Sequence, residues 1–210
     1  MGDPGILTEV MYDRVVAKLS DRDQDLGGVI DRWGAPPFWV RQPGFPGLVL
    51  AILSQQVSLE SAHAAFTRLG ERISPVDPAA FLTLDDGTLK AIGFSRQKAG
   101  YVRGLAEAIA IGTLDLEQLA TLADEQVRET LLAVKGIGRW TADTYLLFAL
   151  RRPDAWPSGD LALAKAIQEV KAMAVMPTYP EADAIAEAWR PWRAVAARIL
   201  WHAYLSARGR

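Results

Sequence analysis

Apolar residues recur at helical spacing along nearly the whole chain. The clearest runs are "LVLAILSQQVSLESAHAAFTRL", "KAGYVRGLAEAIA", "EQVRETLLAV" and "WRAVAARILWHAYL". In each run the apolar positions lie three or four residues apart, which is typical of a helix with one buried face. No two segments show the alternation expected of paired strands. The pattern therefore predicts an all-α protein of roughly eight to ten helices, given the usual helix length.

Short segments rich in Pro, Gly and Asp separate these runs and predict the loops. They include "GAPPFWVRQPGFP", "LDDGTLKAIG", "RRPDAWPSGD" and "MPTYPEAD". In "RISPVDPAA", Ser74 and Asp77 are candidate helix caps, because short polar side chains accept hydrogen bonds from the first amides of a helix. With 210 residues, the chain is long enough for one compact domain or for two small lobes.

The stretch "LLAVKGIGRWTAD" breaks a helical pattern with two glycines, Gly136 and Gly138. Glycine permits a positive φ or a close approach of another group, so the chain can leave one helix and enter the next in a tight turn. The first amides of the second helix have no intrahelical partner and favour an anion such as a phosphate. Arg139 and Lys135 offer counter-charge there, and Thr141 offers a hydroxyl.

A simple helix–turn–helix connection, with a glycine as the cap of the first helix, explains an isolated Gly-X-Gly better than an anion site does. Here the flanking "LLAV" and "ADTYLLFAL" supply matched apolar faces for a packed helical pair. That context favours the anion-binding interpretation.

Composition removes several kinds of chemistry. The chain has no cysteine, which excludes thiol nucleophiles, disulfides, iron–sulfur clusters and cysteine-ligated zinc. Its two histidines, His63 and His202, are too few for most histidine-built metal sites. The formal net charge of −2 argues against a general electrostatic coat for nucleic acid. Catalysis would have to use carboxylates, hydroxyls or lysines. Binding of nucleic acid would need a local anion-binding site in place of a broad positive surface.

Four motifs, taken in order, resemble those of the helix–hairpin–helix base-excision DNA glycosylases. "LLAVKGIGRWTADTYLLFAL" followed by "DAWPSGDLALAKAI" is similar to the family's hairpin and to its Gly/Pro-rich loop ending in an aspartate. "LVLAILSQQVSLESAHAAFTRL" and "WRPWRAVAARILW" resemble the bacterial 3-methyladenine DNA glycosylase II branch. The resemblance covers the chain from about Pro36 to about Tyr204.

The resemblance implies a two-lobed, all-α glycosylase fold with an active-site cleft between the lobes. One lobe would span about residues 45–155, with the hairpin at 131–150, and the other would combine 1–44 with 156–210. The residues before Pro36 are too few for the amino-terminal β-domain of some members. No apolar run is long enough to span a bilayer, and "MGDPGILTEVMYDRV" lacks the pattern of a signal peptide. We therefore expect a cytoplasmic, nucleoid-associated bacterial monomer that binds double-stranded DNA with damaged bases.

Asp160 is the candidate catalytic residue. From spacing alone, an aspartate just before "LALAKAI" is better explained as a helix cap, but the resemblance assigns the family's catalytic aspartate to this position. A fixed carboxylate there would stabilise the cationic sugar formed when a base leaves, and would orient or deprotonate the attacking water. Lyase-type relatives have a lysine nucleophile where this chain has Trp140, so we expect a monofunctional enzyme.

Aromatic residues are the candidates for holding a flipped, electron-poor base. On the last predicted helix, Trp201 points away from the apolar stripe, which consists of Trp192, Ala196, Ile199, Leu200 and Ala203. The resemblance assigns base stacking to Trp201 and places Trp140 in the same pocket, with helix packing as the alternative for each. Phe38 and Trp39 are candidates for another wall, and His202 for the pocket rim.

The segment "LSQQVS" interrupts an apolar run with amides and hydroxyls, which exposure at a loop also explains. By resemblance, Gln56 fills the gap left by the flipped nucleotide in the minor groove, with Gln55 beside it. Ser58 is a candidate phosphate or sugar contact. No cofactor is expected to be required. The family often holds Na⁺ or K⁺ on hairpin carbonyls, which would correspond here to those of Leu132, Val134 and Gly136.

The leading prediction is a monofunctional glycosylase for alkylated bases such as 3-methyladenine and 7-methylguanine. One alternative is a glycosylase of the same fold for uracil, deaminated or oxidised bases. Another is a helix–hairpin–helix module that binds DNA without catalysis. Asp160 and Trp201 distinguish an enzyme from such a module, because a binding module needs neither.

Overall fold

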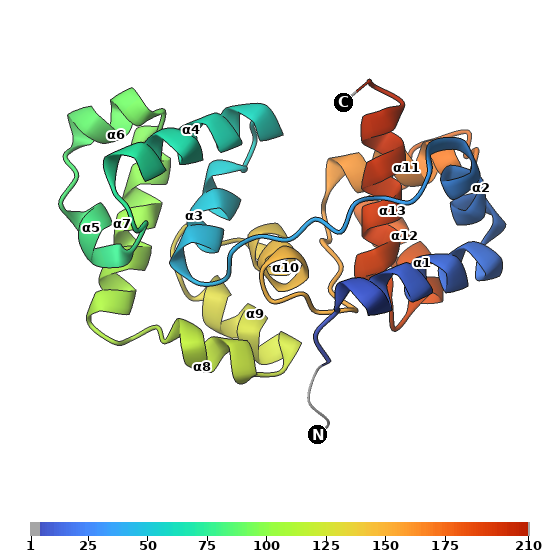
Figure 1. Ribbon diagram of the computed structural model, residues 1–210, viewed down its shortest axis with the longest axis horizontal. Coiled ribbons are helices and arrows are strands. Elements are labelled where there is room, and N and C mark those ends of the chain that lie inside the picture. The colour runs from blue at the N-terminus through green and yellow to red at the C-terminus, as the bar shows by residue number, and fades with distance from the viewer. Residues whose placement is uncertain (1–4, 210) are drawn as a thin grey trace. The chain divides into compact units, whose positions relative to one another are not determined.

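The computed structural model describes residues 5–209. Residues 1–4, which begin the stretch examined for a signal peptide, lie outside the described residues. Over residues 5–209 the chain forms thirteen α-helices, one short 3₁₀ helix and no strand (Figure 1). The helices are α1 Glu9–Arg22, α2 Gln24–Trp33, α3 Phe45–Leu53, α4 Leu59–Arg72, α5 Pro78–Leu82, α6 Asp86–Ile92, α7 Arg96–Ala110, α8 Leu116–Thr121, α9 Asp124–Leu132, α10 Arg139–Phe148, α11 Leu161–Val170, α12 Tyr179–Ala186, η1 Glu187–Trp189 and α13 Arg193–Ser206.

The all-α prediction is confirmed, but the helices outnumber the eight to ten expected. The excess comes from short helices such as α5, α6 and α8, which have five to seven residues each. Helices of this length hold too few turns to show an apolar period. Across the described residues, every helix is too short or too polar to cross a membrane.

The chain divides into two compact units. The terminal unit comprises the residues up to Val40 together with those from Leu146 onward, and the central unit is Arg41–Tyr145. In the terminal unit, α13 packs against α1, α2 and α11 (Figure 1). In the central unit, α3 packs against α4 and α7. Every residue of α3 except Pro46 is buried, which explains its uninterrupted apolar sequence.

Side-chain caps define most helix starts. Asp77 accepts a hydrogen bond from the amide of Ala80 at 2.8 Å and begins α5, which confirms the cap predicted from "SPVD". The other predicted candidate, Ser74, is not the cap of that helix. Side-chain oxygens of this kind also cap further helices, from residues Thr8, Asp23, Ser58, Asp85, Ser95, Asp115, Asp160 and Thr178.

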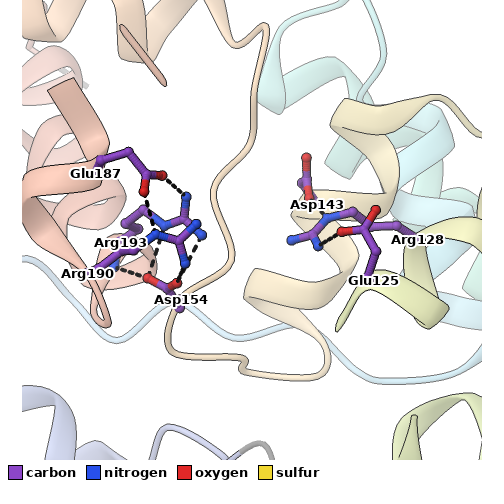
Figure 2. Close-up of polar contacts among 7 residues, drawn as sticks. All are labelled: Glu125, Arg128, Asp143, Asp154, Glu187, Arg190 and Arg193. Atoms are coloured by element: carbon purple, nitrogen blue, oxygen red, sulfur yellow. Dashed lines mark hydrogen bonds and ion pairs between the residues drawn. The ribbon is translucent and has the colours of Figure 1, made fainter. Parts of the chain in front are cut away.

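A buried ion pair joins the two helices of the hairpin. Nε of Arg128 on α9 donates to Oδ1 of Asp143 on α10 at 2.6 Å, and Nη1 donates to Glu125 at 2.9 Å (Figure 2). Burial by itself would lower the pKa of Arg128, but the carboxylates of Asp143 and Glu125 more than offset it and raise that pKa. The Asp143 side chain is fully buried. A charge pair that is shielded from water therefore joins α9 to α10.

Replacing Arg128 is expected to destabilise the central unit strongly. Arg128→Ala leaves the buried Asp143 carboxylate without its main partner, and breaking such a pair costs about 3–5 kcal/mol. Glu125→Gln is the matched control, because Glu125 is 68% exposed and its pairing with Arg128 is worth less than about 1 kcal/mol. Urea unfolding measures both variants. Equal losses in the two would mean that the buried pair does not hold the hairpin.

Candidate functional site

The two glycines of the hairpin have different surroundings. Gly136 has a φ of +93°, and a Cβ atom built on it would lie 2.1 Å from Cγ of Tyr101. A side chain at position 136 would therefore be strained and would collide with the ring. Gly138 has no positive φ, and a Cβ atom there would meet nothing within 4 Å. Packing explains the first glycine but leaves the second unexplained.

Gly138 lies at the amino terminus of α10. Its carbonyl accepts a hydrogen bond from the amide of Ala142 at 3.0 Å, which is the first bond of that helix. Gly138 is exposed, and the neighbouring Arg139 side chain is 63% exposed. Nε of Arg139 lies 3.7 Å from Oδ2 of Asp143, and most of the Arg139 side chain is exposed to solvent. A helix end with a small residue and an exposed cation suits an anion.

Gln55 links the hairpin to the loop that follows α3. Its Nε2 donates to the carbonyl of Gly136 and to Oγ1 of Thr141, both at 2.9 Å. Thr141 is only 2% exposed. This burial argues against the direct phosphate contact expected of Thr141, because its hydroxyl faces Gln55 rather than solvent. Gln55 and Thr141 instead connect the two DNA-binding segments expected from the sequence.

Lys98 supports the same loop from α7. Its Nζ donates to the carbonyls of Leu53 and Gln55 at 2.7 and 2.8 Å, and burial lowers the pKa of its ammonium group. Gln56 follows with a φ of +55° and an exposed side chain. Ser58 caps α4 by accepting from the amide of Ser61 at 3.2 Å. The structure thus brings Gln55 to the hairpin and leaves Gln56 and Ser58 at the surface.

Three hairpin carbonyls, those of Leu132, Val134 and Gly136, are the groups expected to hold a monovalent cation. Carbonyl oxygens are suitable ligands for a hard cation. The carbonyl of Val134 accepts from Ile137 at 3.1 Å, and that of Gly136 accepts from Gln55. Each of these two oxygens keeps a second lone pair that can accept a further contact. Across residues 5–209, no group of three His, Asp or Glu side chains is arranged to hold a metal ion.

In the terminal unit, Asp160 and Trp201 lie beside each other. Asp160 caps α11, since its Oδ1 accepts from the amide of Leu163 at 2.8 Å. The indole Nε1 of Trp201 donates to the same oxygen at 3.4 Å. The ring of Phe148 stacks on Trp201, with centroids 5.3 Å apart and planes at 19°. The cap therefore coexists with an aromatic wall next to the carboxylate.

The remaining predicted aromatic residues occupy three places. Trp39 and His202 are neighbours, with ring centroids 6.3 Å apart. Phe38 instead packs against Tyr12, at a centroid distance of 4.9 Å. Trp140 lies in the first turn of α10, half-buried, and belongs to the central unit. Tyr12 was not anticipated from the sequence.

Sequence reasoning missed two residues behind Trp201. Phe148 looked like part of an ordinary apolar face. Arg198 is fully buried and donates to the carbonyls of Ala194, Trp39 and Leu147, with its guanidinium 5.3 Å from the centroid of the Phe148 ring. Burial lowers the pKa of Arg198 to about 10, so it remains charged at neutral pH. A cation in the apolar run "AARILW" was the available signal.

Similar proteins place this geometry in context. The chain is 27% identical over 203 residues to DNA-3-methyladenine glycosylase 1 of Schizosaccharomyces pombe, covering 90% of this chain and 89% of that protein. It is 32% identical over 199 residues to DNA-3-methyladenine glycosylase 2 of Escherichia coli, covering 88% and 67%. It is also 29% identical over 184 residues to a putative DNA-3-methyladenine glycosylase of Bacillus subtilis, covering 84% of this chain but only 64% of that protein.

A solved structure and a family model agree with these similarities. The structure of the Schizosaccharomyces pombe 3-methyladenine DNA glycosylase (Mag1) in complex with abasic DNA matches with a TM-score of 0.83 and 26% identity, covering 93% of this chain and 97% of that one. The model of the HhH-GPD superfamily base excision DNA repair proteins matches residues 49–191, more than half of the chain. The chain therefore belongs to the HhH-GPD superfamily of base excision DNA repair proteins.

Proposed function

We propose that this protein is a monofunctional DNA glycosylase that takes alkylated bases of the 3-methyladenine and 7-methylguanine type out of duplex DNA and hydrolyses their N-glycosidic bonds. Membership of the superfamily and similarity to proteins named 3-methyladenine DNA glycosylases support the reaction class. The observation that carries the proposal is the contact between Asp160 and Trp201. Because the two side chains are in contact, the carboxylate can act on the sugar of a nucleotide while the indole contacts its base.

Asp160 has the role of stabilising the sugar. Cleavage of the N-glycosidic bond develops positive charge on the sugar, and a carboxylate held in place stabilises that charge most in the transition state. The helix amide that Asp160 caps fixes one of its oxygens. The carboxylate also orients or deprotonates the water that attacks the sugar. An alkylated purine already carries positive charge and leaves readily, so little acid assistance is needed.

Trp201 has the role of stacking on the flipped base. Phe148 stacks on one side of the indole, so the base would use the other side. An electron-poor ring is well held by an aromatic face. Trp39 and His202 would line the rim. Phe38 would support this wall through Tyr12 and Arg198 rather than touch the base.

The central unit has the role of holding the duplex. The exposed amino terminus of α10 at Gly138 would receive a backbone phosphate, with Arg139 as counter-charge. Gln56, which is exposed, would fill the gap left by the flipped nucleotide, and Ser58 would contact the backbone. Gln55 and Thr141 would position these groups. A monovalent cation on the carbonyls of the hairpin would add positive charge near the phosphate.

Base release from a panel of duplexes tests the substrate class. Each duplex holds one of 3-methyladenine, 7-methylguanine, ethenoadenine, hypoxanthine, uracil or 8-oxoguanine, and we expect the two methylated purines to be released fastest. Asp160→Asn should abolish release while leaving binding to a lesion duplex within about tenfold, because it removes transition-state stabilisation rather than contacts. Preferred release of uracil or 8-oxoguanine would contradict alkylated-base specificity. No release from any duplex would favour a binding module.

Borohydride reduction tests the absence of lyase chemistry. Trp140 stands where lyase-type relatives have a lysine, so no Schiff base should form and no covalent protein–DNA adduct should be trapped. Denaturing electrophoresis after reduction measures the adduct. A trapped band would show that another lysine acts as a nucleophile, with Lys135 and Lys165 the first to replace.

The hairpin glycines separate phosphate binding from packing. Gly138→Ala meets no steric obstacle, and alanine at the cap position of α10 should cost only about 1 kcal/mol, so the variant should remain folded. If a phosphate approaches Gly138, the added methyl group should weaken binding to damaged and undamaged duplexes alike, by roughly five- to thirtyfold for one or two lost hydrogen bonds. Fluorescence anisotropy measures the binding, and thermal unfolding the stability.

Two further variants serve as controls for that measurement. Gly136→Ala should lose stability, because its methyl group meets the Tyr101 ring at a positive φ. Trp201→Ala should spare binding to undamaged duplex and reduce excision most for cationic bases. A folded Gly138→Ala protein with unchanged affinity for both duplexes would exclude the phosphate site.

A further inference from the structure

Side-chain hydrogen bonds anchor the loop that leads to Asp160 at two places within the terminal unit, in addition to backbone bonds from Leu7 to Arg151 and from Ala194 to Pro153. The loop runs between α10 and α11, over residues 149–160. Midway along it, Asp154 accepts hydrogen bonds from Nε and Nη2 of Arg193 at 3.0 and 2.9 Å and from Nη1 of Arg190 at 2.6 Å (Figure 2). Glu187 contacts both arginines. This charged cluster holds the middle of the loop and lies six residues before Asp160.

The second anchor is Asp183 on α12. Its Oδ1 accepts from the indole Nε1 of Trp156 at 2.8 Å, and its Oδ2 accepts from the hydroxyl of Ser158 at 2.6 Å. Both partners belong to the loop, and Trp156 is buried. Each carboxylate oxygen of Asp183 thus contacts the loop just before Asp160. Both distances lie within the normal range for hydrogen bonds.

The last part of the loop is also held by packing, because Trp156 lies against Trp189 with ring centroids 5.8 Å apart. Gly159 has a φ of +80° and its added Cβ would meet nothing within 4 Å, so it can rotate more freely than other residues. The amide of Ser158 donates to Trp156 at 2.9 Å, and that of Asp160 donates to Pro157 at 3.3 Å. These are turns within the loop, and they do not fix it to the surrounding helices. The hydrogen bonds to Asp183 connect Trp156 and Ser158 to α12, beside the contact of Trp156 with Trp189.

We infer that Asp183 is a positioning residue that holds the Trp156–Ser158 segment so that the Asp160 carboxylate lies at the correct place against the sugar. The inference rests on the proposed role of Asp160. Asp183 contacts the loop and acts on the reaction through it. A displacement on the order of 1 Å in a catalytic group lowers a rate by about a hundredfold, so a small movement of the loop is sufficient.

Single-turnover excision measures the effect directly. Asp183→Ala removes both contacts, and we expect the excision rate at saturating enzyme to fall on the order of ten- to a hundredfold. Affinity for the lesion duplex should change by less than about threefold, because the contacts proposed for phosphate binding lie in the central unit. Ser158→Ala removes one contact and should give an intermediate rate.

Two variants distinguish positioning from general stability. Asp183→Asn keeps an oxygen that can accept from Trp156 and an amide that can donate to the hydroxyl of Ser158, so it should restore most of the lost rate. Thr178→Ala removes the cap of the same helix, where Thr178 and Glu181 exchange hydrogen bonds, without touching the loop. It should lower the melting temperature while leaving the excision rate close to that of the parent protein.

Each outcome decides the inference. A loss of rate in Asp183→Ala, with rescue in Asp183→Asn and none of that loss in Thr178→Ala, supports it. If the parent protein is active and Asp183→Ala keeps the parent rate, the positioning role is wrong and the proposed function stands. The same conclusion follows if Thr178→Ala loses as much of the excision rate as Asp183→Ala does. A parent protein inactive on every lesion duplex overturns the proposed function and the positioning role together.

Discussion

The first amides of an α-helix have no partner in their own backbone, and this constraint organises both parts of the candidate site. Where α11 begins, Asp160 supplies an oxygen to one of them, and the same bond holds in place the carboxylate that we propose to act on the sugar. Where α10 begins, the cap position is Gly138, which has no side chain to offer. The amino terminus of α11 therefore fixes the carboxylate of Asp160, and the amino terminus of α10 is suited to an anion that does not belong to the chain.

Buried polar contacts keep these helix ends in place. The Arg128–Asp143 pair sets α9 against α10, and Gln55 connects the hairpin to the loop after α3. In the terminal unit, Arg198 holds three carbonyls among aromatic rings, and Asp183 holds the loop before Asp160. Polar groups away from water are costly unless they are paired. Each such pairing therefore favours one arrangement of its neighbours over all others.

The overall charge of the chain is consistent with nucleic-acid binding through individual helix ends rather than through a broad positive surface. A formal net charge of −2 gives no broad attraction for nucleic acid. Helix dipoles and backbone amides act within a few ångströms and are independent of net charge. In the proposed function, the central unit would position a phosphate without reading the base, whereas Asp160 and Trp201 in the terminal unit would select the base and cleave it. In that proposal the two tasks would use different residues in different units.

The sequence by itself determined the helical class, the hairpin and the place of Asp160 before a helix, because apolar spacing, glycine pairs and capping residues are local signals. It did not reveal that Gly136 is required by Tyr101, that Gln55 bonds to Thr141, or that Asp183 holds the loop. These partners lie 35, 86 and 25 to 27 residues apart. Only tertiary packing brings such groups within hydrogen-bonding or van der Waals distance. The folded chain therefore decided which of the predicted residues face solvent and which other residues hold these in place.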